Sequence, residues 1–81
     1  MKLLDTIEMM TSTDYKERFK AEYYQLIIRY RRLQSIVVKY DSEQLNFTPT
    51  CPRSTYDLQL KIMRDYIAML EARAVMEDIV L

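Results

Sequence analysis

Apolar residues recur at alternating steps of four and three residues along two stretches of the chain. The first stretch contains Phe19, Tyr23, Leu26, Tyr30, Leu33, Val37 and Tyr40. The second stretch contains Tyr56, Leu60, Met63, Ile67, Leu70 and Ala74. Such a heptad pattern is typical of a helix that packs lengthwise against another helix. It therefore predicts two long helices, over about residues 14–40 and 52–77, each with one apolar seam.

Polar residues and prolines mark the expected ends of these helices. Thr13 is expected to cap a first helix that begins at Asp14. Pro52 suits the first position of the second helix, with Thr50 or Cys51 before it as the cap. Because the two helices are of similar length, the pattern favours an antiparallel hairpin.

The remaining segments complete a single all-α domain spanning residues 1–81. Residues 41–51 connect the two helices, and we expect Leu45 and Phe47 to fold back onto that end of the hairpin. A short N-terminal helix is expected to present one apolar face, formed by Leu3, Leu4, Ile7 and Met10. A domain of this size buries only a modest core, so assembly of several copies is the expected way to enlarge it.

Further apolar residues lie outside the two seams, where a monomeric hairpin would expose them. They are Tyr24, Ile28, Ile62, Tyr66, Met69 and Met76. Methionine and aromatic side chains at helical spacing are typical of subunit interfaces. We therefore predict a homo-oligomer, a dimer or a larger bundle, that covers these positions. The alternative is that some tyrosines and arginines meet at a subunit boundary and hold a planar anionic ligand.

Composition argues against several functional classes. The chain has no glycine, no histidine and a single cysteine, so glycine-rich phosphate loops, the usual zinc sites and an internal disulfide are not expected. Since histidine is the commonest general acid or base, we expect a protein that is not an enzyme and uses no metal or cofactor. The net charge of zero argues against general nucleic-acid binding. The lone cysteine and short apolar runs fit a cytoplasmic protein without a membrane span.

Two stretches together resemble a group of small phage and prophage helical-hairpin proteins. They are YKERFKAEYYQLIIRYRRL, residues 15–33, and QLKIMRDYIAMLEAR, residues 59–73. That group is similar to the hairpin domain of phage anti-CBASS and anti-Thoeris sponges. The resemblance covers roughly residues 14–77. It implies an oligomer in the cytoplasm of a bacterial host, which captures a cyclic-nucleotide immune signal without cleaving it.

The resemblance also implies where such a signal would bind. An aromatic residue near the start of the first long helix would stack on a base, and Tyr15 fits that role here. Basic side chains would meet the phosphates. The candidates are Lys16, Arg18 and Lys20 nearby, with Arg29 and Arg32 farther along. From the residues alone, Tyr15 and the three nearby bases are expected to form a solvated first turn of the helix.

Two other functions fit the same sequence. One is a helical adaptor or inhibitor that docks on a host defence protein or another protein. Its docking surface would be the exposed face formed by Ile62, Tyr66, Met69 and Met76. The other is a purely structural oligomer. Substitutions would separate these hypotheses, because Tyr15→Ala should abolish ligand capture while Met69→Asp should abolish docking or assembly.

Overall fold

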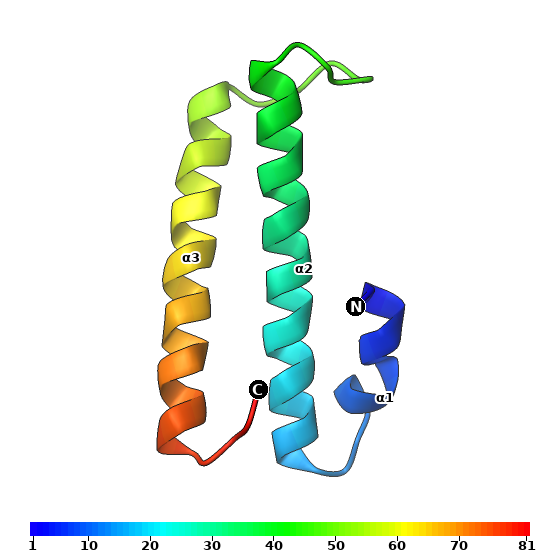
Figure 1. The fold of residues 1–81 in the computed structure, drawn as a ribbon, viewed down its shortest axis with the longest axis vertical. Helices are drawn as coiled ribbons and strands as arrows, with labels where there is room; N and C mark the ends of the chain where they lie inside the picture. The colour runs from blue at the N-terminus through cyan, green and yellow to red at the C-terminus, as the bar shows by residue number, and fades with distance from the viewer.

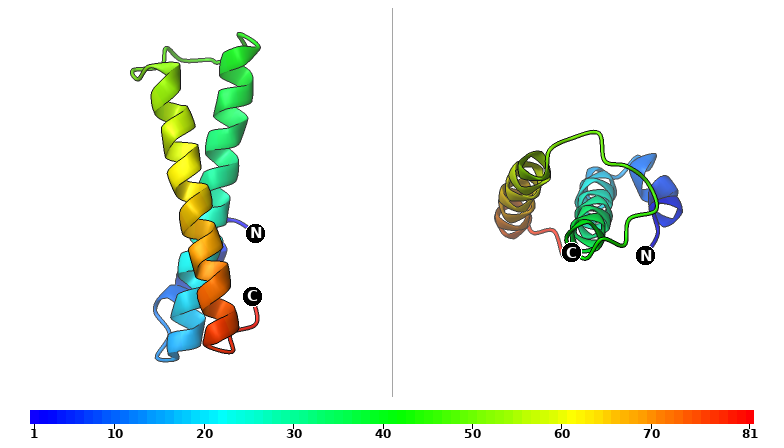
Figure 2. Two further views of the ribbon diagram at one scale, coloured as in Figure 1. Left: turned by 90° about the vertical axis from the view of Figure 1, so that its left-hand side faces the viewer. Right: turned by 90° about the horizontal axis from the view of Figure 1, so that it is seen from above.

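The computed structural model describes all of residues 1–81 and is all-helical, as predicted. Two long antiparallel helices, α2 (Tyr15–Asp41) and α3 (Arg53–Met76), lie side by side (Figure 1). A short N-terminal segment contains the 3-10 helix η1 (Leu3–Thr6), which runs directly into α1 (Ile7–Met10). This segment packs on the side of α2 that faces away from α3, so α2 is the central element (Figure 2). None of the helices combines the length and the apolar character that a membrane span requires.

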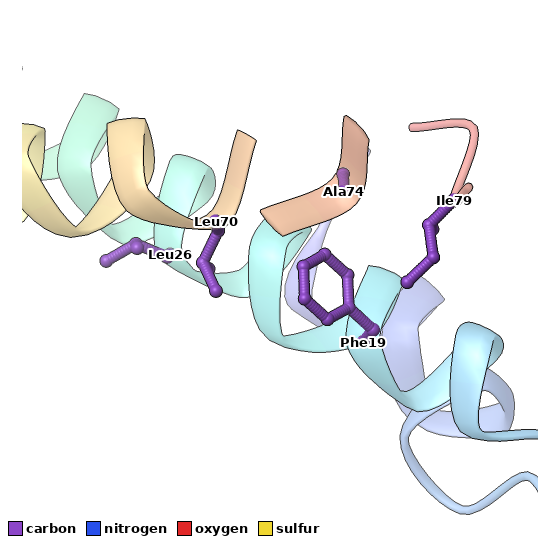
Figure 3. Packing of buried hydrophobic residues seen from close by; sticks show 5 residues of the cluster. All are labelled: Phe19, Leu26, Leu70, Ala74 and Ile79. Atoms are coloured by element: carbon purple, nitrogen blue, oxygen red, sulfur yellow. The ribbon is translucent and has the colours of Figure 1, made fainter. Parts of the chain in front are cut away.

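The two predicted seams form the contact between α2 and α3. Every seam residue is buried or half-buried, so the pairing deduced from the heptad pattern is confirmed. The most buried part of the core lies toward the start of α2 and the end of α3, where Phe19, Leu26, Leu70, Ala74 and Ile79 meet (Figure 3). Ile79 follows α3, and sequence periodicity did not place it in the core.

The helices begin one residue later than predicted. Asp14, not Thr13, caps α2, since the Asp14 carboxylate accepts a hydrogen bond of 2.9 Å from the backbone N–H of Lys16. Pro52 precedes α3 as its cap residue and makes no side-chain cap bond. Its ψ of 151° is extended, so helical geometry starts at Arg53.

Both long helices end in a left-handed residue, although the chain has no glycine. Glu43 after α2 and Asp78 after α3 have φ values of 58° and 55°. In each case the next residue donates its backbone N–H back into the last turn, from Gln44 to Lys39 and from Ile79 to Ala74, both at 2.8 Å. This arrangement is a Schellman motif, and polar residues such as Asp tolerate its left-handed position better than apolar ones do. At the end of α3 the motif turns Ile79 into the core.

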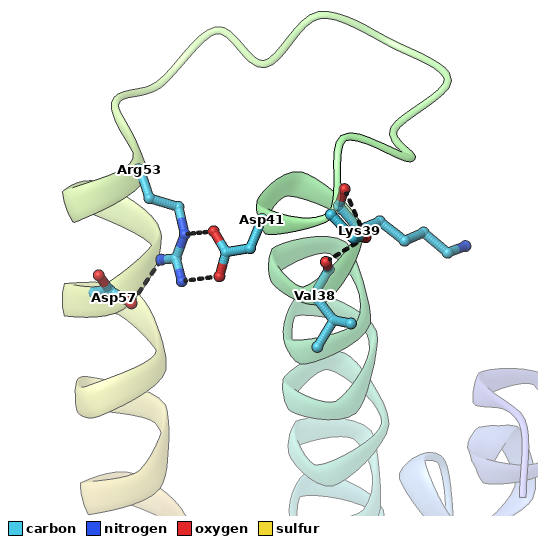
Figure 4. Close-up of polar contacts among 6 residues, drawn as sticks. Val38, Lys39, Asp41, Arg53 and Asp57 are labelled. Carbon is cyan, nitrogen blue, oxygen red and sulfur yellow. Dashed lines mark hydrogen bonds and ion pairs between the residues drawn. The ribbon is translucent and has the colours of Figure 1, made fainter.

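The connection between the long helices is fixed by one arginine. Arg53 donates to both carboxylate oxygens of Asp41, at 2.8 and 3.1 Å, and to Asp57 at 2.6 Å (Figure 4). The hydrogen bonds from Arg53 to Asp41 hold the pKa of the Asp41 carboxyl below its usual value. Leu45 folds back and is half-buried, as predicted, whereas Phe47 is exposed.

The N-terminal segment does not bury the apolar face that was predicted for it. Leu4, Ile7 and Met10 are exposed, whereas Thr6 is buried. The cause is the 3-10 turn, in which residues three apart lie above one another, so Leu3 and Thr6 share the face toward α2. The Thr6 hydroxyl donates to the Leu3 carbonyl at 2.7 Å and accepts from the Gln25 amide at 2.9 Å.

Candidate functional site

The largest cavity, of about 370 Å³, lies on α2 where both ends of the chain come together. The two chain ends lie toward the same side of the molecule and flank α2 (Figures 1 and 2). The cavity is lined by Met1, Tyr23, Tyr24, Ile27, Ile28, Arg31 and Leu81. Residues 24, 28 and 31 share one face of α2 because they are spaced by four and three residues. Helical periodicity therefore places the aromatic, aliphatic and cationic groups in one line.

A second hollow of about 310 Å³ adjoins this cavity and is more cationic. Its lining includes Lys2, Arg32 and Ser35, and it shares Met1, Ile28 and Arg31 with the first cavity. No ion pair within the chain involves Lys2, Arg31 or Arg32. We refer to the two adjoining hollows together as the α2 pocket. It has an aromatic end and a cationic end.

The two tyrosines of the α2 pocket differ in their hydrogen bonding. The Tyr23 hydroxyl donates to the Glu71 carboxylate on α3 at 3.1 Å. Burial raises the pKa of Tyr23, and the bond to Glu71 raises it further. The Tyr24 ring lies edge-on to Tyr23, with centroids 5.5 Å apart. The hydroxyl of Tyr24 makes no hydrogen bond within the chain, so Tyr24 is free to meet a ligand.

Tyr15, the aromatic residue implied by the sponge resemblance, lies in a closed network at one end of the hairpin. Its hydroxyl donates to Glu77 at 2.7 Å and accepts from Arg73 at 2.9 Å. The bond to Glu77 raises the pKa of Tyr15 and lowers that of the Glu77 carboxyl. The Arg73 guanidinium also lies 5.1 Å from the centroid of the Phe19 ring, a cation–π contact. The network joins the first turn of α2 to the last turn of α3.

The three basic residues near Tyr15 also have partners within the chain. The Lys16 ammonium donates to the Asp78 carbonyl at 3.0 Å, and the Arg18 guanidinium donates to the Ser12 carbonyl at 2.7 Å. Lys20 pairs with Glu17 at 3.3 Å. These contacts agree with the expectation that this segment is a solvated first turn of the helix.

The structure does not gather the six predicted ligand-binding residues into one site. Arg32 lines the cationic end of the α2 pocket, whereas Arg29 is exposed and lines neither hollow. Tyr15 lies 13 residues before Ile28 in α2, or about 20 Å along the axis at 1.5 Å per residue. No group of three or more acidic or cysteine side chains lies close enough together to hold a metal ion.

The predicted interface residues fall into two groups. Tyr24 and Ile28 are half-buried and line the α2 pocket, whereas Ile62, Met69 and Met76 are exposed on α3. Tyr66 is also exposed, and its hydroxyl donates to the Glu22 carboxylate on α2.

Among the residues that line the α2 pocket, sequence reasoning gave no binding role to Met1, Lys2, Ser35 and Leu81. No local pattern indicates the two chain ends, because the turn after α3 and the path of the N-terminal segment bring them to α2. The sequence does carry one signal for this pocket, because Tyr24 and Arg31 are seven residues apart and therefore lie on the same face of a helix.

Residues 13–76 match the model of the Sequestin family. The chain belongs to the Sequestin family. The match includes α2, α3 and their connection, and the family name denotes sequestration of a partner. It agrees with the predicted membership of a sequestering group, whereas the specific likeness to the hairpin domain of the anti-CBASS and anti-Thoeris sponges stays a prediction. No curated protein matches the chain. No solved structure matches it either.

Proposed function

We propose that this Sequestin sequesters a small anionic immune signal of the cyclic-nucleotide type and holds it without cleaving it. The observation that supports the proposal is the α2 pocket, in which Tyr24, whose hydroxyl makes no hydrogen bond within the chain, adjoins the unpaired cations Lys2, Arg31 and Arg32. The family name supports sequestration as the mode of action. In this proposal the protein is phage-encoded and acts as an anti-defence protein in the cytoplasm of the bacterial host.

The two ends of the α2 pocket suit the two parts of a nucleotide. A base would stack on Tyr24 beside Ile28, a contact typically worth about 1–3 kcal/mol. The phosphates would meet Arg31, Arg32 and Lys2, since guanidinium groups form paired hydrogen bonds with phosphate oxygens. The larger hollow alone, at about 370 Å³, is within the usual size range for small-molecule sites.

Capture alone is sufficient for this role. Tight binding lowers the free concentration of a signal, and it requires no group that stabilises a transition state. The base would stack on Tyr24 and not on Tyr15, because the Tyr15 hydroxyl is already bonded to Glu77 and Arg73. The sponge resemblance implies a site centred on Tyr15, so the experiment must distinguish that site from the α2 pocket.

The test is a thermal-shift screen of the purified chain against cyclic di- and trinucleotides and ADP-ribose-type signals. A ligand at about 100 times its dissociation constant stabilises the native state by about 2.7 kcal/mol, a readily visible shift in a small domain. The expected hit binds with measurable heat in titration calorimetry. It should also be recovered chemically unchanged after heat denaturation of the protein. A degraded ligand would refute sequestration without cleavage.

Variants locate the site. Tyr24→Ala and Arg31→Glu should each abolish the shift, whereas Arg29→Glu, the same charge reversal outside the α2 pocket, should preserve it. Loss of binding in Tyr15→Ala with retention in Tyr24→Ala would move the site to the end of the hairpin. The absence of any shift across the screen would refute capture of such signals.

The exposed apolar residues of α3 favour a second candidate function. Ile62, Met69 and Met76 each expose more than half of their surface, which is typical of a surface that meets another protein. The chain would then act as an adaptor or inhibitor of a host defence protein. Co-purification from the host with the wild-type chain, lost on Met69→Asp, would support this candidate. Nucleotide binding by the same variant would argue for sequestration instead.

A further inference from the structure

Helix α3 carries a second heptad seam that has no partner within the chain. Its positions again follow steps of four and three residues. They are Leu58, Ile62, Asp65, Met69, Ala72 and Met76. All six are exposed, and the exposed fraction is 58% for Leu58 and Ile62, 59% for Met69 and 78% for Met76. We call these six residues the outer seam.

The outer seam lies on the opposite side of α3 from the seam that contacts α2. At 100° per residue, the mean directions of the two seams differ by about 160°. The N-terminal segment packs on α2 and makes no packing contact with α3, and the view from above shows α3 at one edge of the row of helices (Figure 2). The outer seam therefore faces solvent along most of the helix.

We infer that the outer seam is the surface through which two copies of this chain pair, with their α3 helices antiparallel. In one register, every residue of the outer seam faces a residue of the partner's outer seam. Leu58 then faces the partner's Met76, Ile62 faces the partner's Ala72, and Asp65 faces the partner's Met69. The two-fold axis passes at the level of Ile67. The contact extends for about 27 Å along each helix at 1.5 Å per residue.

Pairing of two copies is favoured because the outer seam is complementary to a second outer seam that runs in the opposite direction. A large side chain meets a small one where Ile62 faces Ala72, which allows close packing of the helices. The single charged position meets an apolar one, and Asp65 keeps its contact with Lys61 on its own helix, 3.7 Å away. A parallel pair would instead place the two Asp65 carboxylates opposite each other, and such like-charge contacts are destabilising.

The residues that flank the outer seam also fit an antiparallel pair. In this register Ala68 lies beside the partner's Ala68, Gln59 beside the partner's Arg73, and Lys61 beside the partner's Val75. No like charges are brought together at these positions. The pairing uses α3 alone and leaves the α2 pocket open, so the inference does not depend on which ligand that pocket takes.

The first test is the mass of the full chain in solution, measured by light scattering and by sedimentation across a range of concentrations. We expect a dimer, at twice the protomer mass of 9.8 kDa. Met69→Asp and Ile62→Asp should each weaken self-association by at least about 100-fold, because each buries a second charge in the contact. The control is Val38→Asp on α2, where Val38 is 66% exposed and lies outside the outer seam.

Circular dichroism on the same samples shows whether each variant keeps its helices, which is expected because the substituted side chains are exposed in the single chain. A wild-type monomer at all concentrations would overturn the inference, and a host protein bound to a monomeric chain would assign the surface to that partner. A dimer that survives Met69→Asp but dissociates on Val38→Asp would place the interface elsewhere.

The second test fixes the orientation, in a Cys51→Ser background that removes the native thiol. Ile62→Cys combined with Ala72→Cys should form intermolecular disulfides, because the two positions face each other across the pair. Within one chain these positions are about 15 Å apart along the helix, too far for a disulfide. Ile62→Cys alone should not cross-link. Efficient cross-linking of that single variant would establish a parallel pair and refute the antiparallel one.

Discussion

Truncation of Leu70 tests whether the buried end of the hairpin carries the stability of the fold. Leu70 is 1% exposed and packs with Phe19, Leu26 and Ala74. Replacing such a leucine with alanine removes hydrophobic burial and leaves a cavity, at a usual cost of about 3–5 kcal/mol. A domain of 81 residues has a total stability of about 4–12 kcal/mol. Leu70→Ala should therefore remove a quarter or more of the free energy of unfolding.

The assay is thermal unfolding followed by circular dichroism, with three leucines of α3 compared. At about 4–8 °C per kcal/mol for a domain of this size, Leu70→Ala should lower Tm by at least about 12 °C or prevent folding. Leu60→Ala, at a half-buried position, should have a smaller effect. Leu58→Ala, at an exposed position, should change Tm by a few degrees at most when measured at low protein concentration. Equal shifts for Leu70→Ala and Leu58→Ala would refute the assignment of the core.

Three further predictions test individual contacts. Arg53→Lys cannot reproduce the paired hydrogen bonds of a guanidinium, so amide exchange in residues 42–52 should accelerate with little change in Tm. The bond from Tyr15 holds the pKa of Glu77 below its ordinary value of 4.5, so its stabilisation is present above that pH and lost as the pH falls through the lowered pKa. Wild-type Tm should then fall more steeply than that of Glu77→Gln between about pH 5 and pH 3. Thr6→Val leaves the Gln25 amide without its buried acceptor and should cost about 1 kcal/mol in chemical denaturation, more than the exposed control Thr11→Val.

The hairpin could be predicted because its signal is local and periodic. Each seam residue is fixed by its spacing from the previous one, so Leu26 and Leu70 could be placed in the core without knowledge of the rest of the chain. The helix ends were displaced by one residue, because the sequence does not show whether Asp14 and Pro52 adopt extended or helical dihedral angles. Boundary shifts of this size are usual for helix termini.

The N-terminal segment and the α2 pocket could not be predicted in the same way. The burial of Thr6 depends on a 3-10 turn, which shifts the phase of the segment relative to an α-helix. Leu81 reaches α2 only because Asp78 adopts a left-handed conformation and Ile79 packs into the core. The partners of Tyr15 lie 58 and 62 residues away in sequence, and no local pattern indicates them.

The salt dependence of the two surfaces provides a last prediction, because the surfaces differ in their physical character. Lys2, Arg31 and Arg32 remain unpaired in a chain with zero net charge, so an anion in the α2 pocket would gain its Coulombic attraction from them. That attraction is screened as the Debye length falls from about 10 Å at 0.1 M salt to about 3 Å at 1 M. Association through the outer seam buries mainly apolar surface and should be insensitive to sodium chloride over this range.

Titration calorimetry of the anionic ligand and sedimentation of the free protein, each at low and high sodium chloride, measure the two responses separately. Ligand affinity should fall with salt while the dimer dissociation constant stays nearly constant. Arg32→Gln should reduce the salt slope of ligand binding and leave dimerisation unchanged, because Arg32 lies in the α2 pocket and α3 alone forms the outer seam. A dimer that dissociates with salt would show that charges dominate its contact, and the apolar outer seam could not then be the interface.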